Sequence, residues 1–385
     1  MSGFFSGNDG DFDRVFMTTT DLIDQFVGES LFGCGYNFYG TLGDNTSSNR
    51  NSLVQITGGG VDWRQVSIIG YNSAAIKTDG TLWTWGINSS GQLGTNNTIS
   101  RSSPVTTVAG GTNWKQVYAG NNNAAAIKTD GTLWIWGLNS SGQLGTNNST
   151  NRSSPVTTVA GGTNWKQVAC GQSFTSAIKT DGTLWTWGNN SGGVLGDNTT
   201  STRSSPVTTV SGGTNWKQVA CGIGNMAAIK TDGTLWTWGN NADGQLGDNT
   251  SSNRSSPVTT VSGGTNWKQV SCGAFSVAAI KTDGTLWTWG KNTFGQLGDN
   301  TTSTRSSPVT TVAGGTNWKQ VACAYSIAAI KTDGTLWTWG RNTYGGLGHN
   351  NTSNRSSPVN PVGSFNNWKQ VSCGYTNTIG IVQTV

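Results

Sequence analysis

Histidine and glutamate are almost absent from this sequence. Among 385 residues there is one histidine, His349, and one glutamate, Glu29. Only 11% of the residues are charged, against about 25% in an average protein. Histidines and paired carboxylates carry most acid–base catalysis, and histidine is a principal zinc ligand. The composition therefore predicts a protein that is not an enzyme and holds no metal or other cofactor.

Long apolar segments are also absent. No run of about 20 apolar residues occurs, so we expect no membrane insertion. The N-terminus lacks the basic start and apolar stretch of a secretory signal peptide. Basic residues recur singly at fixed intervals and never in runs, so the net charge of +5 does not indicate a nucleic-acid partner.

Residues 1–30 differ from the rest in charge, with six acids and one arginine. From Asp21 to Gly28 they can form a short amphipathic helix with acids in its first turn. We predict an arm that anchors the protein to other chains; packing on its own domain is the alternative. The anchoring side chains would be Phe12, Phe16, Leu22, Ile23, Phe26 and Val27.

A repeat accounts for all 19 tryptophans. Leu-Trp-x-Trp-Gly ends at Gly86 and recurs five more times at intervals of 51 or 50 residues. A degenerate copy, Leu-Phe-Gly-Cys-Gly, ends at Gly35. A second marker, Trp-(Lys/Arg)-Gln-Val, first occurs at Trp63 and appears seven times. The sequence after residue 30 is therefore an array of seven units.

Each unit predicts four short strands. Strand A is Trp-Lys-Gln-Val-Ala-Cys-Gly, B is Ala-Ala-Ile-Lys, C is Thr-Leu-Trp-Thr-Trp-Gly, and D is Pro-Val-Thr-Thr-Val. Asp-Gly between B and C, as at Asp232-Gly233, indicates a two-residue hairpin turn. The proline that opens D, for example Pro257, suits an edge strand, so D is expected outermost. Four-stranded units of this length are typical of β-propeller blades.

The chain enters and leaves the array in the middle of a unit. Residues 31–60 supply strands C and D, and residues 364–385 supply A and B. Pairing of the two ends would close the ring and leave no open terminal blade. We therefore predict an all-β fold over residues 31–385: a seven-bladed β-propeller of four-stranded blades, closed by pairing of N- and C-terminal strands in one blade.

The repeat resembles a known family. Val-x-Cys-Gly, followed by Ala-Ile-Lys-Thr-Asp-Gly-Thr-Leu-Trp-Thr-Trp-Gly-x-Asn-x-x-Gly-Gln-Leu-Gly, is similar to the regulator of chromosome condensation (RCC1-like) repeat over about residues 31–385. The resemblance implies a seven-bladed propeller. The exchange factor that gives the family its name acts on a small GTPase and has a basic tail and inserted loops. This chain has an acidic arm and no comparable insertion.

The units differ mainly in two sets of loops. Because strands alternate in direction, the A–B and C–D loops share one face, and these loops vary while B–C is constant. Their mixture of Tyr, Phe, Ser, Asn and Gly is typical of adaptable binding surfaces; drift in permissive loops is the alternative. We predict a face that binds a protein or glycan through Tyr71, Asn122, Phe174, Phe275, Phe294, Tyr325, Tyr344 and Tyr375.

Other chemically suggestive residues have structural interpretations. Five cysteines, beginning with Cys170, share one position of strand A that holds Ile68 and Ala119 in two units, so we interpret them as packing near the axis. The tryptophan pairs are expected in the core. Asp9 to Asp13 resembles the start of a calcium loop without its glycine and glutamate. His349 is expected to be exposed and incidental.

Two functions remain open at this point. The first is a structural and binding protein of a virion, such as a phage tail, fibre or capsid appendage, assembled in the host cytoplasm and held to other virion proteins by the arm. The alternative is a soluble, cytoplasmic RCC1-like regulatory module that acts as a guanine-nucleotide exchange factor or as an inhibitor-type protein binder.

Overall fold

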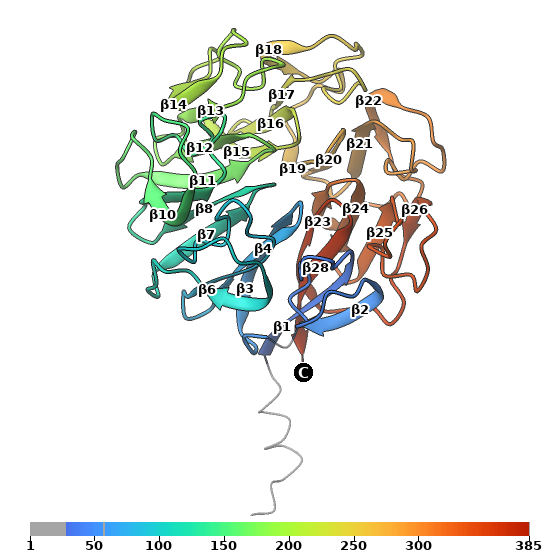
Figure 1. Cartoon of the computed structure of the whole chain (residues 1–385). Helices are drawn as coiled ribbons and strands as arrows, with labels where there is room; N and C mark the ends of the chain where they lie inside the picture. The colour runs from blue at the N-terminus through green and yellow to red at the C-terminus, as the bar shows by residue number, and fades with distance from the viewer. Residues whose placement is uncertain (1–27, 57, 385) are drawn as a thin grey trace, which may run out of the picture.

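Seven blades surround a central axis (Figure 1). The computed structural model describes residues 28–56 and 58–384. These residues form seven four-stranded antiparallel sheets, six of them built from consecutive strands. The predicted all-β, seven-bladed propeller with four-stranded blades is confirmed. Among the described residues, no helix is long and apolar enough to span a membrane.

The blades are numbered in chain order, and their strands run from the axis outwards. Blades 1 to 3 consist of β3 (Trp63–Ile69), β4 (Asn72–Lys77), β5 (Leu82–Gly86) and β6 (Arg101–Thr106); β7 (Trp114–Ala119), β8 (Asn123–Lys128), β9 (Leu133–Gly137) and β10 (Arg152–Thr157); and β11 (Trp165–Cys170), β12 (Phe174–Lys179), β13 (Leu184–Gly188) and β14 (Arg203–Thr208).

The remaining blades follow the same order. Blades 4 to 6 consist of β15 (Trp216–Cys221), β16 (Asn225–Lys230), β17 (Leu235–Gly239) and β18 (Arg254–Thr259); β19 (Trp267–Cys272), β20 (Ser276–Lys281), β21 (Leu286–Gly290) and β22 (Arg305–Thr310); and β23 (Trp318–Cys323), β24 (Ser326–Lys331), β25 (Leu336–Gly340) and β26 (Arg355–Val359). The closing blade consists of β27 (Trp368–Cys373), β28 (Asn377–Thr384), β1 (Gly28–Gly35) and β2 (Arg50–Ile56).

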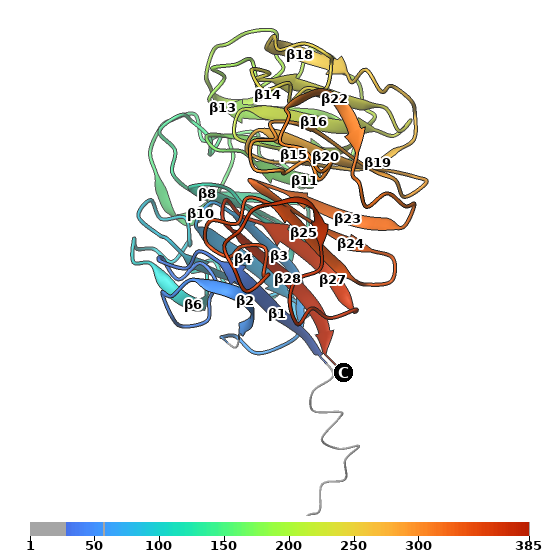
Figure 2. The ribbon, with the colours of Figure 1, turned by 90° about the vertical axis from the view of Figure 1, so that its right-hand side faces the viewer.

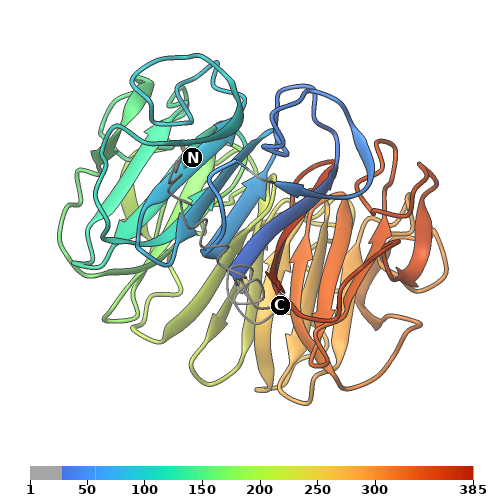
Figure 3. The ribbon, with the colours of Figure 1, turned by 90° about the horizontal axis from the view of Figure 1, so that it is seen from below.

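The two ends of the chain complete one blade, as predicted (Figures 2 and 3). Strand β1 pairs with β28 in an unbroken antiparallel register from Gly28–Thr384 to Gly35–Asn377. Strand β1 begins at Gly28, so three residues that the sequence places in the arm belong to this pairing. The arm residues predicted to anchor the protein (Phe12, Phe16, Leu22, Ile23, Phe26 and Val27) lie outside the described residues.

The outermost strands begin earlier than expected. In blade 4 the strand starts at Arg254, three residues before Pro257, and ends at Thr259. Its pairing with β17 shifts register between the Thr237–Val258 and Gly239–Arg254 pairs. A bulge on an edge strand tolerates a residue without an N–H. The predicted edge position of strand D is confirmed, whereas the proline lies inside the strand and not at its start.

The B–C hairpins also differ in detail from the prediction. The Lys230 N–H donates to Thr234 O and the Gly233 N–H donates to Lys230 O, which encloses a three-residue loop. Only Gly233 has a positive φ, of 80°, whereas a two-residue type I′ turn needs two such residues. Asp-Gly therefore marks the hairpin correctly, but the turn is a type I turn followed by a left-handed glycine.

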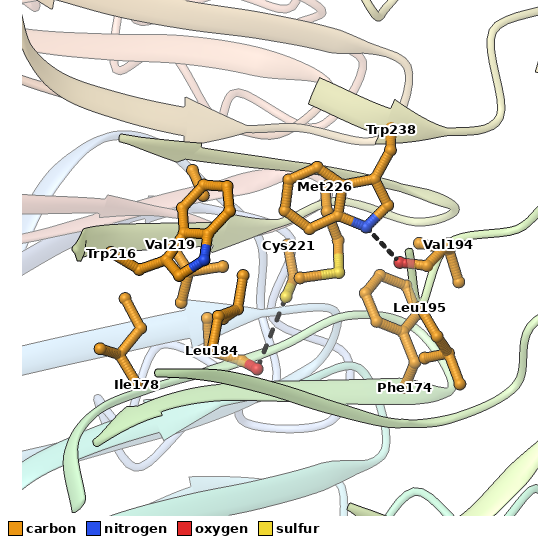
Figure 4. Close-up of a cluster of buried hydrophobic side chains, with 12 residues drawn as sticks. Phe174, Ile178, Leu184, Val194, Leu195, Trp216, Val219, Cys221, Met226 and Trp238 are labelled. Carbon is orange, nitrogen blue, oxygen red and sulfur yellow. Dashed lines mark hydrogen bonds between the residues drawn. The ribbon is translucent and has the colours of Figure 1, made fainter. Parts of the chain in front are cut away.

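Seven apolar clusters lie between neighbouring blades of the described chain, and they form the core. Between blades 3 and 4, Trp216 and Trp238 pack against Ile178, Leu184 and other apolar side chains of blade 3 (Figure 4). The Trp238 indole N–H donates to Val194 O at 2.8 Å across this boundary. The tryptophan of the Trp-(Lys/Arg)-Gln-Val marker and the second tryptophan of each pair are buried in this inter-blade layer, as predicted, whereas the first tryptophan of each pair, such as Trp236, is only partly buried.

A ring of glutamines joins the innermost strands. Gln65 receives the Val117 N–H at 3.0 Å and donates to Val117 O at 2.9 Å, in the next blade. The same side chain accepts the valine N–H of the next blade at every boundary, and Gln370 accepts from Val66 at 2.9 Å to complete the circle. The glutamine of Trp-Lys-Gln-Val thus supplies a side-chain bridge where the diverging inner strands have no backbone pairing.

Candidate functional site

Aromatic side chains gather on the face formed by the A–B and C–D loops. Nine of them, from four neighbouring blades, form what we term the aromatic cluster. Its members are Tyr36, Phe38, Tyr39, Tyr71, Phe275, Phe294, Tyr325, Tyr344 and Tyr375. They include six of the seven tyrosines of the sequence.

Tyr36 lies at one centre of this cluster. It follows directly on β1, and its ring centroid is 5.0 Å from that of Tyr344 and 5.3 Å from that of Tyr71. Phe38 and Tyr39, on the same loop, lie 6.4 Å and 6.3 Å from it. Tilted and edge-on contacts at these separations are the favoured arrangements of aromatic pairs. Loops of the closing blade, blade 1 and blade 6 therefore meet through their rings.

The cluster continues around the axial opening toward blade 5. Tyr71 contacts Tyr375 at 6.2 Å, Tyr375 contacts Tyr325 at 5.5 Å, and Tyr325 contacts Phe275 at 6.0 Å. Phe38 is 64% exposed and Tyr344 is 37% exposed, while Tyr375 is half-buried. The result is a partly exposed aromatic arc with its most accessible rings at the closing blade and blade 6.

Two cations border the arc. The Arg341 guanidinium carbon lies 5.2 Å from the ring centres of both Phe294 and Tyr325. Lys291 lies over Phe275 at 5.0 Å and forms an ion pair with Asp243 at 3.6 Å. Within the described residues, Arg341 has no ion pair with an acid. Arg341 therefore lies over two rings, and its charge is available to a ligand.

Burial perturbs the tyrosines of the arc. It raises the pKa of Tyr36, and the neighbouring Tyr39, Tyr71 and Tyr344 add to the effect. Burial likewise raises the pKa of Tyr375, whose hydroxyl has no hydrogen-bond partner among the described residues. The hydroxyls of Tyr36 and Tyr375 are therefore neutral at physiological pH, and the charge beside the arc belongs to Arg341 and Lys291.

The predicted binding residues divide into two groups. Tyr71, Phe275, Phe294, Tyr325, Tyr344 and Tyr375 all belong to the aromatic cluster. Phe174 does not: it is 1% exposed and packs in the core between blades 3 and 4. Asn122 lies in the A–B loop of blade 2 and contributes no ring to the cluster. The structure thus places six of the eight together.

Sequence reasoning missed Tyr36, Lys291 and Arg341. All three occupy the residue directly after Leu-Trp-x-Trp-Gly or its degenerate copy, where the other units have Ile87, Leu138, Asn189 and Asn240. This position is the first of the C–D loop and is as variable as the rest. Alignment of the units at that residue would have identified it.

Comparison with protein-family models identifies the family of this chain. The model of the RCC1-like domain matches residues 149–384, and models of the RCC1 repeat match residues 79–127, 63–92 and 114–143. The first match covers more than half of the chain. This chain belongs to the RCC1-like domain family. The resemblance noted in the sequence is therefore confirmed.

Individual relatives agree with this assignment. The RCC1-like propeller is 30% identical over 286 residues to the ultraviolet-B receptor UVR8 of Arabidopsis thaliana, across 73% of this chain and 65% of that protein. It is 28% identical over 306 residues to the E3 ubiquitin-protein ligase HERC2 of Homo sapiens, across 76% of this chain but 6% of that protein. The chain thus spans less than two thirds of the curated relatives that it matches.

Solved structures show the same fold. Yeast RCC1 (Prp20), in its complex with Kap60, superposes with a TM-score of 0.82 at 17% identity, covering 100% of this chain and 96% of that one. Human WBSCR16 superposes with a TM-score of 0.80 at 20% identity, covering 92% and 99%. At these identities the likeness concerns the fold alone.

The cysteines of the RCC1-like propeller are free thiols, and all six are buried. Burial raises the pKa of Cys34, Cys221 and Cys323 to about 12, so these thiols are not nucleophiles near neutral pH. Four line an axial cavity of about 20 Å³, which has room for roughly one water. Among the described residues no group of His, Cys, Asp or Glu could hold a metal ion. Burial supports packing near the axis for the five cysteines of the innermost strands, whereas Cys34 lies on β1, the third strand from the axis.

His349 is not exposed, contrary to the prediction. It is 6% exposed, and its Nε2 lies 3.1 Å from the Thr338 hydroxyl. In four other blades an aspartate at this position pairs with the first arginine of the outer strand, as Asp197 does with Arg203 at 2.9 Å. The replacement leaves the Arg355 Nε buried without a partner in the described structure. His349, like Thr95 and Thr146 in blades 1 and 2, therefore lacks the ion pair that the aspartates of the four other blades form.

Because His349 replaces the aspartate of other blades, we predict that the protein loses stability at acidic pH. Burial, followed by Arg355, lowers the pKa of His349, so the unfolded chain binds its proton more readily. Stability contributed by neutral His349 is complete above its ordinary pKa of 6.5 and decreases as the pH falls toward the folded pKa. We expect His349→Asp to pair with Arg355, to add about 0.2–1 kcal/mol near neutral pH, and to raise the melting temperature more at acidic pH. Equal gains above and below pH 6.5 would contradict this explanation.

Proposed function

We propose that this RCC1-like propeller is a regulatory module that binds a protein partner through the aromatic cluster and does not itself catalyse a reaction. The observation that carries the proposal is the convergence of nine aromatic side chains and Arg341 from four blades on one face. Tyrosine and arginine are enriched among the residues that dominate protein–protein affinity. Such a surface has more aromatic area than solubility alone would favour.

Arg341 indicates the chemistry of the partner. Its guanidinium lies over two aromatic rings and has no ion pair within the described residues. A carboxylate on the partner would pair with this guanidinium through a charge-assisted hydrogen bond. Since the chain also carries a net charge of +5, we propose a partner surface with acidic and apolar groups side by side.

The relatives support protein binding as the class of function. The solved structures of yeast Prp20 are described as bound to Kap60 and in terms of binding to Gsp1p and histones. Within that class we propose the alternative that the sequence raised, namely a guanine-nucleotide exchange factor or an inhibitor-type protein binder. The virion hypothesis, the anchoring arm and the cellular location stay predictions, since neither the fold nor the comparisons bear on them.

The test uses residues of the cluster that are exposed or half-buried, so that folding is preserved. A partner captured by the full chain is purified and titrated against the wild type and against Phe38→Ala, Tyr344→Ala and Arg341→Ala. For a residue that dominates the interface, we expect a loss of about 2 kcal/mol, or roughly 30-fold in Kd. Affinity is measured by calorimetry.

The matched control lies far from the cluster. Val210 follows the outer strand of blade 3 and is 54% exposed, so Val210→Ala removes a similarly exposed apolar side chain. It should leave the affinity unchanged. Equal affinity of the wild type and all three cluster variants would show that the partner binds elsewhere.

A further inference from the structure

A hollow lies on the face that carries the aromatic cluster. It is between blades 3 and 4, opposite the closing blade across the axis. It has a volume of about 340 Å³, within the usual size of small-ligand sites. Its polar rim consists of Gln172, Ser173, Asn189, Ser191 and Asn240. None of the residues that line it is charged, and none belongs to the aromatic cluster.

The hollow exists because blade 3 departs from the repeat. Four other blades have a glutamine at the position of Val194, and its Oε1 accepts the backbone N–H two residues earlier, as Gln143 does from Ser141 at 2.8 Å. Val194 has no carboxamide to fill this space. The residue two positions before it is Gly192, where blades 1 and 2 have serine. Both changes remove side-chain atoms from the same place.

Two asparagines present donors to this space in fixed orientations. Asn189 Oδ1 accepts from the Ser191 N–H at 3.0 Å and from its hydroxyl at 2.8 Å. Asn240 Oδ1 accepts from the Ala242 N–H at 3.0 Å and from Gln245 Nε2 at 3.1 Å. The Nδ2 groups of both have no partner within the described residues. Since the oxygens are occupied, each carboxamide is held with its NH₂ free for a ligand acceptor.

The floor of the hollow is apolar. Phe174 and Val194 form it with Ile223, and the first two are buried in the core cluster (Figure 4). A ligand that suits this site has acceptor oxygens along one edge, an apolar C–H face and no charge, because a charge would find no counter-charge here. A pyranose ring combines these properties. We propose that this groove, the saccharide groove, binds one neutral saccharide unit.

The test uses variants that restore the sequence of other blades. Val194→Gln reintroduces the consensus glutamine. Gly192→Ser reintroduces a serine, and its Cβ would lie no closer than 3.5 Å to Asn240. Binding of glucose, galactose, mannose and N-acetylglucosamine is followed by saturation-transfer NMR and titration. We expect at least one sugar to bind the wild type and both variants to raise its Kd at least about tenfold.

The matched control removes the glutamine at the position equivalent to Val194 in another blade. Gln143→Val changes blade 2, and it should leave sugar binding through the saccharide groove intact. The proposal is wrong if none of the four sugars binds the wild type at millimolar concentration. It is also wrong if the folded Val194→Gln and Gly192→Ser variants bind sugar as the wild type does. The same holds if these variants lower only the affinity for the protein partner of the aromatic cluster.

Discussion

A chain that ends at Gly374 is expected to lose the cooperative folding of the complete propeller. This truncation removes β28, the partner of both β1 and β27. It also removes Ile379, Ile381 and Val382, which are at most 1% exposed. Loss of three such side chains costs roughly 6–15 kcal/mol, as much as the whole stability of about 5–15 kcal/mol of a typical domain. The hairpin of β1 and β2 would then have no strand to join it to the ring.

Thermal unfolding followed by circular dichroism and size-exclusion chromatography measures this loss. The control is a chain that ends at Gln383, which keeps all but one of the β1–β28 residue pairs. It should melt as one transition close to that of the full chain. A truncated chain ending at Gly374 that is monomeric and melts like the full chain would show that ring closure contributes little.

Replacement of Trp238 by alanine is expected to have the second largest effect. The indole is fully buried between blades 3 and 4, and its N–H donates to Val194 O at 2.8 Å. Truncation leaves a large cavity and an unpaired carbonyl, and comparable changes cost about 3–5 kcal/mol. Urea denaturation followed by tryptophan fluorescence measures the change in the free energy of unfolding.

The repeat supplies its own controls for this prediction. Trp289 occupies the same position in blade 5, is equally buried, and donates to Gln245 O at 3.0 Å, so Trp289→Ala should cost a similar amount. Trp238→Phe keeps one aromatic ring in the layer but loses the indole hydrogen bond and leaves Val194 O unpaired, at about 1–3 kcal/mol. A cost for Trp238→Ala no larger than that of Trp238→Phe would contradict a packing role.

The fold was predictable because the repeat contains its own evidence. Seven copies of Trp-(Lys/Arg)-Gln-Val, with complementary half-units at the two ends of the array, favour a closed ring. The boundaries of individual strands were less predictable. Pro257 lies inside its strand because a bulge at the sheet edge accommodates it, and such a bulge depends on the neighbouring strand and not on local propensity. His349 was placed wrongly for a related reason: its burial depends on contacts with Thr338 and Val359 in the strands of its own blade.

The candidate site was only partly predictable. Comparison of the units identified the variable face and most of the aromatic side chains on it. It could not show that Tyr36 and Tyr344 touch, because they lie at opposite ends of the chain and meet only through the closing blade. It also placed Phe174 on the surface, although the side chain turns into the layer between blades.

By itself, the sequence determined the number of blades, the order of strands within each blade and the way in which the ring closes. These follow from the period of the repeat and from the two half-units that flank the complete ones. Only the tertiary structure decided which variable side chains meet. Residues of different blades come together around the axis at distances set by the ring, and one-dimensional spacing does not contain those distances. The shortage of histidine and glutamate limits acid–base and metal chemistry and can be read from the sequence. The aromatic cluster and the saccharide groove arise from packing between blades, so only the tertiary structure shows them.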